Sequence, residues 1–94
     1  MKKADARRAI DALGLTLDQA ASAQRSIGRA TTKEEIEIVR MGNGDVVVRR
    51  SRPGHVGHQV FETIIRPDGG KTVVQMAFDA DGNLVHFDPK GGAP

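Results

Sequence analysis

The sequence predicts a single α+β domain in which two N-terminal helices pack on an antiparallel β-meander of four to five strands. Three observations predict this fold. Apolar residues recur at helical spacing in the first third of the chain, alternate with polar residues from about residue 35 onward, and are then interrupted by Gly-containing turns. The 94 residues fit one domain, with helices over about 3–28, a sheet over about 35–88 and a frayed tail at 89–94.

Two helices are predicted from the spacing of apolar residues and from the residues at the helix ends. In ADARRAIDALGL, apolar residues recur every three to four positions from Ala6 to Leu13, and a glycine follows. In TLDQAASAQRSIG, Thr16 is the expected N-cap and Gly28 the expected end. We expect the second helix to bury a narrow stripe made of Leu17, Ala20, Ala21, Gln24 and Ile27.

Five strands are predicted from alternating segments: EIEIVRM, VVVRR, HQVFETIIR, KTVVQMAF and NLVHF. The connecting sequences are MGNGD, SRPGHVG, PDGG and DADG, and Asn-Gly or Asp-Gly between apolar runs is a strong hairpin signal. Before the first strand, Thr31 in TTKEE has a glutamate three residues on, which is typical of a capping box and of a helical turn. The connectivity indicated is a simple meander.

The composition excludes several classes of site and favours an anionic partner. The absence of cysteine excludes disulfides and thiolate metal sites, no apolar run approaches the ~20 residues of a membrane span, and no signal peptide or other targeting signal is visible. The net charge is +2 and unevenly placed, because residues 46–66 hold four arginines and one glutamate. A local basic face favours an anionic partner such as nucleic acid. The lack of Tyr and Trp argues against the usual single-strand binder that stacks bases.

The expected strand register gathers polar groups on one face of the sheet. If PDGG is the turn, Arg66 pairs with Lys71 and Glu62 lies opposite Gln75, since side chains alternate between faces. One face then carries His58, Glu62, Arg66, Lys71 and Gln75. The other carries Phe61, Ile65, Val74, Met76 and Phe78, and is the expected core face.

The DADG turn decides the position of His86. With a two-residue turn, His86 lies beside Ala77 on the Glu62 face, and this is the arrangement we expect. With a three-residue loop ending in a left-handed Gly82, His86 lies opposite Met76 on the core face.

The chemistry that fits these residues is RNA cleavage without a metal or other cofactor. Glu62 with His86 or His58 provides a general base and a general acid, and nearby cations stabilise the charge of a phosphorane. A weaker alternative is a metal site, and with it a metal-dependent DNase, built from His55, His58 and His86, with Asp88 as a further possible ligand. A third alternative is a non-enzymatic protein-binding module, immunity-like or regulatory, which the thin core and the Val and Ile residues on both sheet faces favour.

Two helices before an antiparallel meander, with basic and histidine residues on one sheet face, resemble the barnase-like ribonuclease toxins. This group includes the C-terminal toxin domains of contact-dependent inhibition and other polymorphic toxin proteins. The resemblance covers the last forty residues or so by pattern, in GHQVFETIIRPDGGKTVVQMAFDADGNLVHFDPKGG, and the whole chain by order of elements.

The resemblance implies an endoribonuclease whose substrate is often tRNA. It implies Glu62 and His86 as acid and base, and Arg50, Arg52 and Lys71 as phosphate-binding residues. From the expected sheet face and the basic loop we add His58 as a further catalytic residue, and Arg49, His55 and Gln75 as further phosphate- or RNA-binding residues. It also implies a cognate immunity protein, expected to be acidic, and delivery into the cytoplasm of a target bacterium as part of a larger secreted protein. No membrane insertion by this domain is expected.

Overall fold

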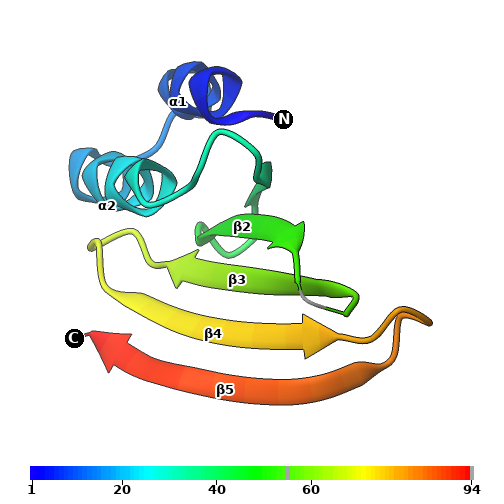
Figure 1. Ribbon diagram of the computed structural model, residues 1–94. Helices are drawn as coiled ribbons and strands as arrows, with labels where there is room; N and C mark the ends of the chain where they lie inside the picture. The colour runs from blue at the N-terminus through cyan, green and yellow to red at the C-terminus, as the bar shows by residue number, and fades with distance from the viewer. Residues whose placement is uncertain (55, 94) are drawn as a thin grey trace.

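The computed structural model, which describes residues 1–54 and 56–93, has the predicted α+β architecture (Figure 1). Helices α1 (Lys3–Asp11) and α2 (Leu17–Gly28) precede a five-stranded antiparallel sheet. The strands follow one another in the order β1-β2-β3-β4-β5 and are β1 (Glu35–Arg40), β2 (Val46–Pro53), β3 (His58–Ile65), β4 (Lys71–Phe78) and β5 (Leu84–Ala93). The predicted meander is therefore confirmed. The sheet ends later than expected, because β5 continues through the segment predicted to fray.

Helix α2 begins and ends as predicted, but it buries a different face. Thr16 is the N-cap, and its side chain accepts a hydrogen bond from the backbone N–H of Gln19 at 3.0 Å. The expected apolar stripe is wrong at its outer residues, because Leu17 is 90% exposed and Ala21 is also exposed, although Ile27 is buried as predicted. The buried face is instead made of Gln19, Ser22, Ala23, Ser26 and Ile27.

Polar contacts explain the rotation of α2. The Gln19 side-chain amide donates to the carbonyl oxygens of Gly44 at 2.8 Å and Ile65 at 3.1 Å. One turn from the other end, the hydroxyls of Ser26 and Thr63 lie 3.3 Å apart. These buried groups would be left without partners if Leu17 turned inward, and an unpaired buried polar group costs more than an exposed leucine.

Three of the four hairpins share one loop design, which the sequence suggested only as the alternative for the DADG turn. Each is closed by an N–H to carbonyl hydrogen bond across three loop residues, from Met41 to Asp45, Arg66 to Gly70 and Asp79 to Asn83. The third loop residue is a glycine with positive φ in every case: Gly44 at 93°, Gly69 at 88° and Gly82 at 85°. This is the three-residue hairpin in which glycine takes the left-handed position.

The loop design shifts β4 by one residue relative to the expected register. Ile65, rather than Arg66, pairs with Lys71, and Glu62 pairs with Val74 rather than with Gln75. A one-residue shift moves every side chain of a strand to the other face. The predicted polar face and core face are therefore both wrong: Lys71 and Gln75 share the helix-covered side, whereas Val74, Met76 and Phe78 share the side of Glu62.

His86 reaches its place by a route that combines the two expected alternatives. The loop is the three-residue form, but the register of β4 and β5 then shifts between Ala77 and Phe78. Phe78 pairs with Leu84 and Ala77 pairs with His86, which leaves one extra residue in β5. His86 thus lies beside Ala77 as expected, but on the side of the helices and away from Glu62.

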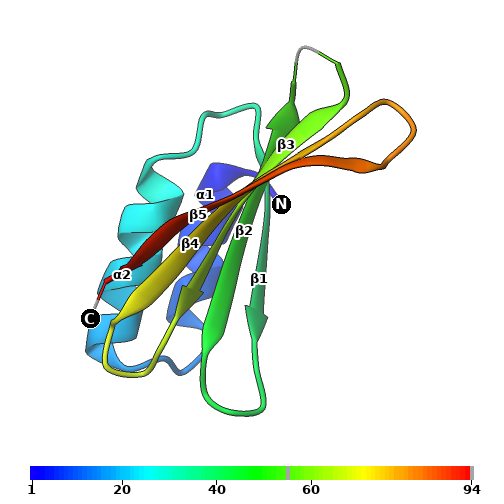
Figure 2. The same cartoon turned by 90° about the horizontal axis from the view of Figure 1, so that it is seen from below.

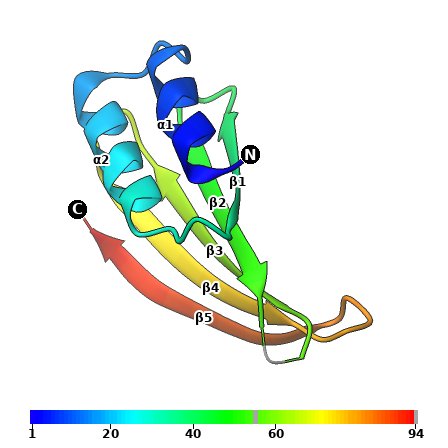
Figure 3. The ribbon, with the colours of Figure 1, turned by 45° about the horizontal axis from the view of Figure 1, so that its top comes forward.

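The hydrophobic core occupies only part of the sheet. It lies between the helices and strands β1–β3 and consists of Ala6, Ile10, Ala23, Ile27, Ala30, Ile36, Val46, Val48 and Ile65. Helix α1 contacts β1, and α2 contacts β2 and β3, while β4 and β5 mainly contact their neighbouring strands. Figures 2 and 3 show that one end of the sheet projects beyond both helices. We call this end, residues 51–54, 56–61 and 75–88, the arm.

The two loops at the tip of the arm are packed against each other. Gly57 has a φ of 88°, and a Cβ atom at this position would lie 2.0 Å from the carbonyl oxygen of Phe78. The β2–β3 loop can therefore approach the end of β4 only because residue 57 is a glycine.

Among the described residues, no helix is long and apolar enough to cross a membrane.

Candidate functional site

The structure divides the predicted site residues between the two faces of the sheet. On the open face, opposite the helices, lie Arg49, His58 and Glu62. On the helix side lie Arg50, Arg52, Lys71, Gln75 and His86. His55 lies outside the described residues. The predicted acid–base pair of Glu62 and His86 is thus separated by the sheet itself, and the arrangement expected for it does not form.

The polar residues of the open face do not converge. Arg49 Nε lies 3.9 Å from Glu62 Oε2, at the outer limit of an ion pair. His58 is four residues before Glu62 on the same strand, a separation of about 13 Å along the strand. Its ring stacks on Phe78 with the ring centroids 4.9 Å apart and an interplanar angle of 12°. His58 and Glu62 therefore belong to different neighbourhoods of this face.

Arg50 has a structural role. Its guanidinium donates to Glu34 Oε1 at 2.8 Å, and the two side chains are only 11% and 0% exposed. The other oxygen of Glu34 accepts the backbone N–H of Thr31 at 2.7 Å, which is the glutamate contact of the predicted capping box. Glu34 thus ties the segment before β1 to the middle of β2, and Arg50 presents little of its charge to solvent.

Of the remaining helix-side residues, Arg52, Gln75 and His86 gather on the arm around Ala77, whereas Lys71 lies at the far end of β4. Strand pairing places Arg52, Gln59, Ala77 and His86 in one row across four strands, and Phe61, Gln75 and Asp88 in the next row. Neighbouring strands are about 4.8 Å apart and successive rows about 7 Å apart. We call these seven residues the Ala77 cluster. Ala77 has the smallest side chain of its row, and the polar side chains of the cluster surround it.

Several contacts hold the cationic side of the cluster in place. Arg52 donates to Gln59 Oε1 from Nε at 3.3 Å and from a terminal nitrogen at 3.1 Å. The guanidinium carbons of Arg50 and Arg52 each lie 5.0 Å from the centroid of the Phe61 ring, within the range of a cation–π contact. Arg52 itself is exposed. These contacts present a guanidinium to solvent at one end of the row.

The β5 side of the cluster carries an imidazole and a carboxylate. His86 is exposed, and Asp88 lies two residues further along the same face of β5. The Lys90 ammonium donates to the Asp88 carboxylate and holds the pKa of that carboxyl below its ordinary value, and the charge of His86 acts in the same direction. Asp88 therefore stays ionised at neutral pH, and it shares this face of β5 with the His86 imidazole.

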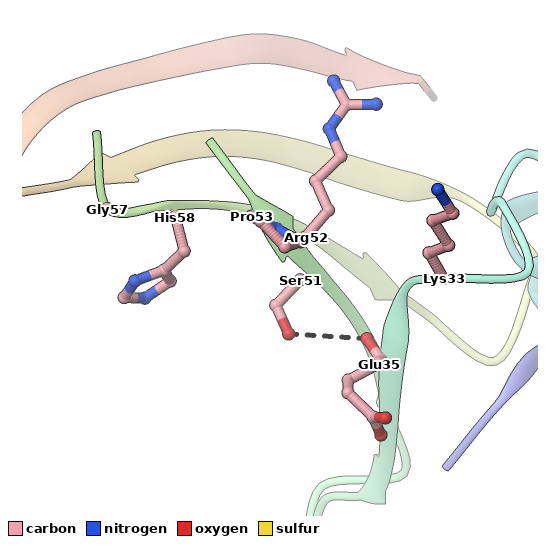
Figure 4. A pocket seen from close by; sticks show the side chains of 7 residues that line it. All are labelled: Lys33, Glu35, Ser51, Arg52, Pro53, Gly57 and His58. Carbon is pink, nitrogen blue, oxygen red and sulfur yellow. Dashed lines mark hydrogen bonds between the residues drawn. The ribbon is translucent and has the colours of Figure 1, made fainter. Parts of the chain in front are cut away.

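A separate hollow of about 370 Å³ lies at the edge of β2, where β1 begins opposite Ser51 (Figure 4). The side chains that line it point to both sides of the sheet. Figure 4 shows Arg52 and Lys33 on one side, and His58, Ser51 and Glu35 turned to the other. The hollow therefore extends the cationic surface around Arg52 but does not collect groups for acid–base chemistry.

No metal centre emerges from the described part of the chain, where no three His, Asp or Glu side chains gather as ligands. The metal site expected from three histidines cannot bring two of them together, since His58 and His86 lie on opposite faces of the sheet. The third, His55, is outside the described residues.

Three cluster residues were missed in the sequence: Gln59 and Phe61 altogether, and Asp88 as anything but a possible metal ligand. Gln59 and Phe61 alternate with His58 and Glu62 and were assigned to the face opposite the expected site. The signal that would have found them is the glycine spacing of the loops, which sets the register of β4.

Comparison with protein-family models, curated proteins and solved structures gave no match to this chain.

Proposed function

We propose that this domain is a metal-independent endoribonuclease that cleaves RNA at the Ala77 cluster. The observation that carries the proposal is the gathering of a guanidinium, two amides, an imidazole and an ionised carboxylate on one partly exposed patch of the arm. These are the groups that bind a phosphodiester and move protons around it. The proposed activity is the one predicted from the sequence, but the proposed site lies on the helix side of the sheet instead of the Glu62 face.

The proposed reaction uses the two ends of the row. Arg52 binds the non-bridging phosphate oxygens, and the amides of Gln59 and Gln75 orient the sugar–phosphate backbone. Asp88 accepts the proton of the 2′-hydroxyl, whose oxygen bonds to phosphorus while the bond to the 5′ oxygen breaks. His86 in its protonated form donates a proton to that leaving oxygen. The products are a 2′,3′-cyclic phosphate and a 5′-hydroxyl.

The spacing along β5 supports this assignment. Residues two apart on a strand point to the same face about 7 Å apart, so Asp88 and His86 can reach opposite sides of one phosphate. Glu62 and Arg49, on the other face, have no part in the proposed reaction. The preference for tRNA, the acidic immunity protein and the delivery into a target bacterium stay predictions of the resemblance.

The test is cleavage of end-labelled single-stranded RNA and tRNA in the presence of EDTA, with His86→Ala compared with His58→Ala. Both histidines are exposed and both lie on the arm, so the pair differs in the face of the sheet and in the stacking of His58 on Phe78. We expect His86→Ala to lower the rate by about 100-fold or more and His58→Ala to leave it nearly unchanged.

RNA left intact by the unaltered chain, both in EDTA and with divalent metal, would overturn the proposal. Cleavage that disappears only in EDTA would favour the metal-dependent alternative. Loss of activity in His58→Ala and Glu62→Ala, but not in His86→Ala, would place the site on the open face.

A further inference from the structure

The open face of the sheet has an apolar area over strands β3–β5, beside His58 and Glu62, and no described part of the chain covers it. Both helices lie on the opposite side (Figures 1 and 2). Its accessible apolar side chains are Val74, Met76, Phe78, Leu84 and Phe87, while Val60 of the same face is only 2% exposed. Leu84 is 52% exposed and Phe87 is 57% exposed. The solvated face of an antiparallel sheet is normally polar, so an apolar one indicates contact with another molecule.

Next to this apolar area, at the β1–β2 end, the open face has a hollow with acidic character. Its volume is about 200 Å³, and it is lined by Glu37, Val39, Met41, Val47, Arg49 and Glu62. Two carboxylates face one guanidinium, and Glu37 takes part in none of the ion pairs formed within the described residues. Val39 and Met41, 48% and 46% exposed, provide apolar walls. A long aliphatic side chain with a cationic end fits such a site.

We propose that the open face docks a partner protein that presents an apolar strand face and, beside it, a lysine or arginine that enters the hollow. The apolar area provides the contact surface for the partner, and the negative charge of the hollow favours a partner with a cationic side chain at that place. This partner differs from the acidic inhibitor that the resemblance implies. It would bind on the face opposite the Ala77 cluster and leave that cluster accessible, and it does not depend on the cluster being a nuclease site.

A second copy of the chain fits this face poorly. In a symmetric face-to-face dimer, the two-fold axis lies in the plane of the interface. An axis along the strands sets β1 of one copy against β5 of the other, so Glu37 meets apolar residues near Phe87. An axis across the strands sets β1 against β1, so acidic residues meet acidic residues. Arg49, the basic residue of the hollow, already lies beside Glu62. Neither arrangement brings a cation to Glu37.

The test uses a displayed library of cyclic β-hairpins with Val, Ile or Phe on one face and Lys, Arg, Gln or Glu at one flanking position. We expect selection on the unaltered chain to enrich Lys or Arg over Glu by about tenfold. Selection on Glu37→Lys should reverse that preference. A selected hairpin should bind Phe87→Asp about tenfold more weakly and bind Leu17→Asp unchanged. Leu17 is the matched control, because it is 90% exposed and lies on the helix layer.

Failure to select any hairpin, or equal recovery of Lys and Glu at the flanking position, would overturn the proposal. Self-association of the chain that Phe87→Asp abolishes would show that a second copy is the occupant, and would overturn it as well. Thermal unfolding of each variant checks that it is folded. RNA cleavage by Phe87→Asp is measured alongside and should be unchanged, which separates this proposal from the nuclease assignment.

Discussion

Arg49 and Arg50 are neighbours in β2, and each lies beside a glutamate, yet they belong to opposite faces of the sheet and to different surroundings. Arg50 donates to Glu34 at 2.8 Å, and both side chains are almost completely buried. Arg49 lies 3.9 Å from Glu62, with side chains 42% and 27% exposed. The comparison shows that the buried Arg50–Glu34 pair uses its charges to hold the fold together, while Arg49 and Glu62 keep theirs partly exposed on the open face.

The largest effect expected from this comparison is on stability. Glu34→Ala should lower the free energy of unfolding by about 3–5 kcal/mol, because it leaves the Arg50 guanidinium buried without its partner and removes the acceptor of the Thr31 N–H. Glu62→Ala should change it by about 1 kcal/mol or less, because an exposed ion pair contributes little. Urea denaturation of the two variants measures both values. Equal losses would contradict the difference drawn between the two pairs.

The elements of the fold could be predicted from the sequence because they depend on local signals. Alternating apolar residues mark all five strands, and Thr16 at the start of α2 caps the helix as its side chain predicts. The rotation of α2 could not be predicted in this way. It follows from the contacts of Gln19 and Ser26 with residues far away in the chain, and these contacts exist only in the folded protein.

The faces of the sheet were harder to predict than the strands, since they depend on loop length to within one residue. Reading PDGG as the turn placed Lys71 opposite Arg66 and gathered the polar residues with Glu62. The actual loop ends at Gly69 and moves β4 by one residue. Of the predicted site residues, Arg52, Gln75 and His86 come together in the Ala77 cluster, whereas Lys71 lies at the far end of β4.

A smaller effect is expected at the loop that positions His86 on the helix side. The Asp79 carboxylate accepts hydrogen bonds from the backbone N–H groups of Asn83 at 2.9 Å and Asp81 at 3.0 Å. These bonds, the one from Asn83 first, hold the pKa of Asp79 below its ordinary value of 3.8. A carboxyl group whose pKa is lowered by folding stabilises the fold above its ordinary pKa, and this contribution is lost as the pH falls through the lowered value.

Acidification from about pH 6 to pH 2 should therefore reduce the hydrogen-exchange protection of amides in the β4–β5 hairpin. Asp79→Ala should show reduced protection already at neutral pH and a weaker dependence on acid. Asp81→Ala is the matched control from the same loop, because only its backbone N–H takes part in the contact. Protection in Asp79→Ala equal to that in the unaltered chain would mean that the loop does not depend on this carboxylate.

The most direct test of the division between the faces is to locate bound RNA by NMR. A short 2′-O-methylated RNA has no 2′-hydroxyl to attack the phosphate, so it can be titrated into the isotope-labelled protein without being cleaved. We predict that amide shifts will concentrate at Arg52, Gln59, Gln75, Ala77, His86 and Asp88, and will be small at Arg49, Val60, Glu62 and Val74. Shifts concentrated at the second group, or no shifts at low salt, would contradict the assignment of the RNA site to the helix side.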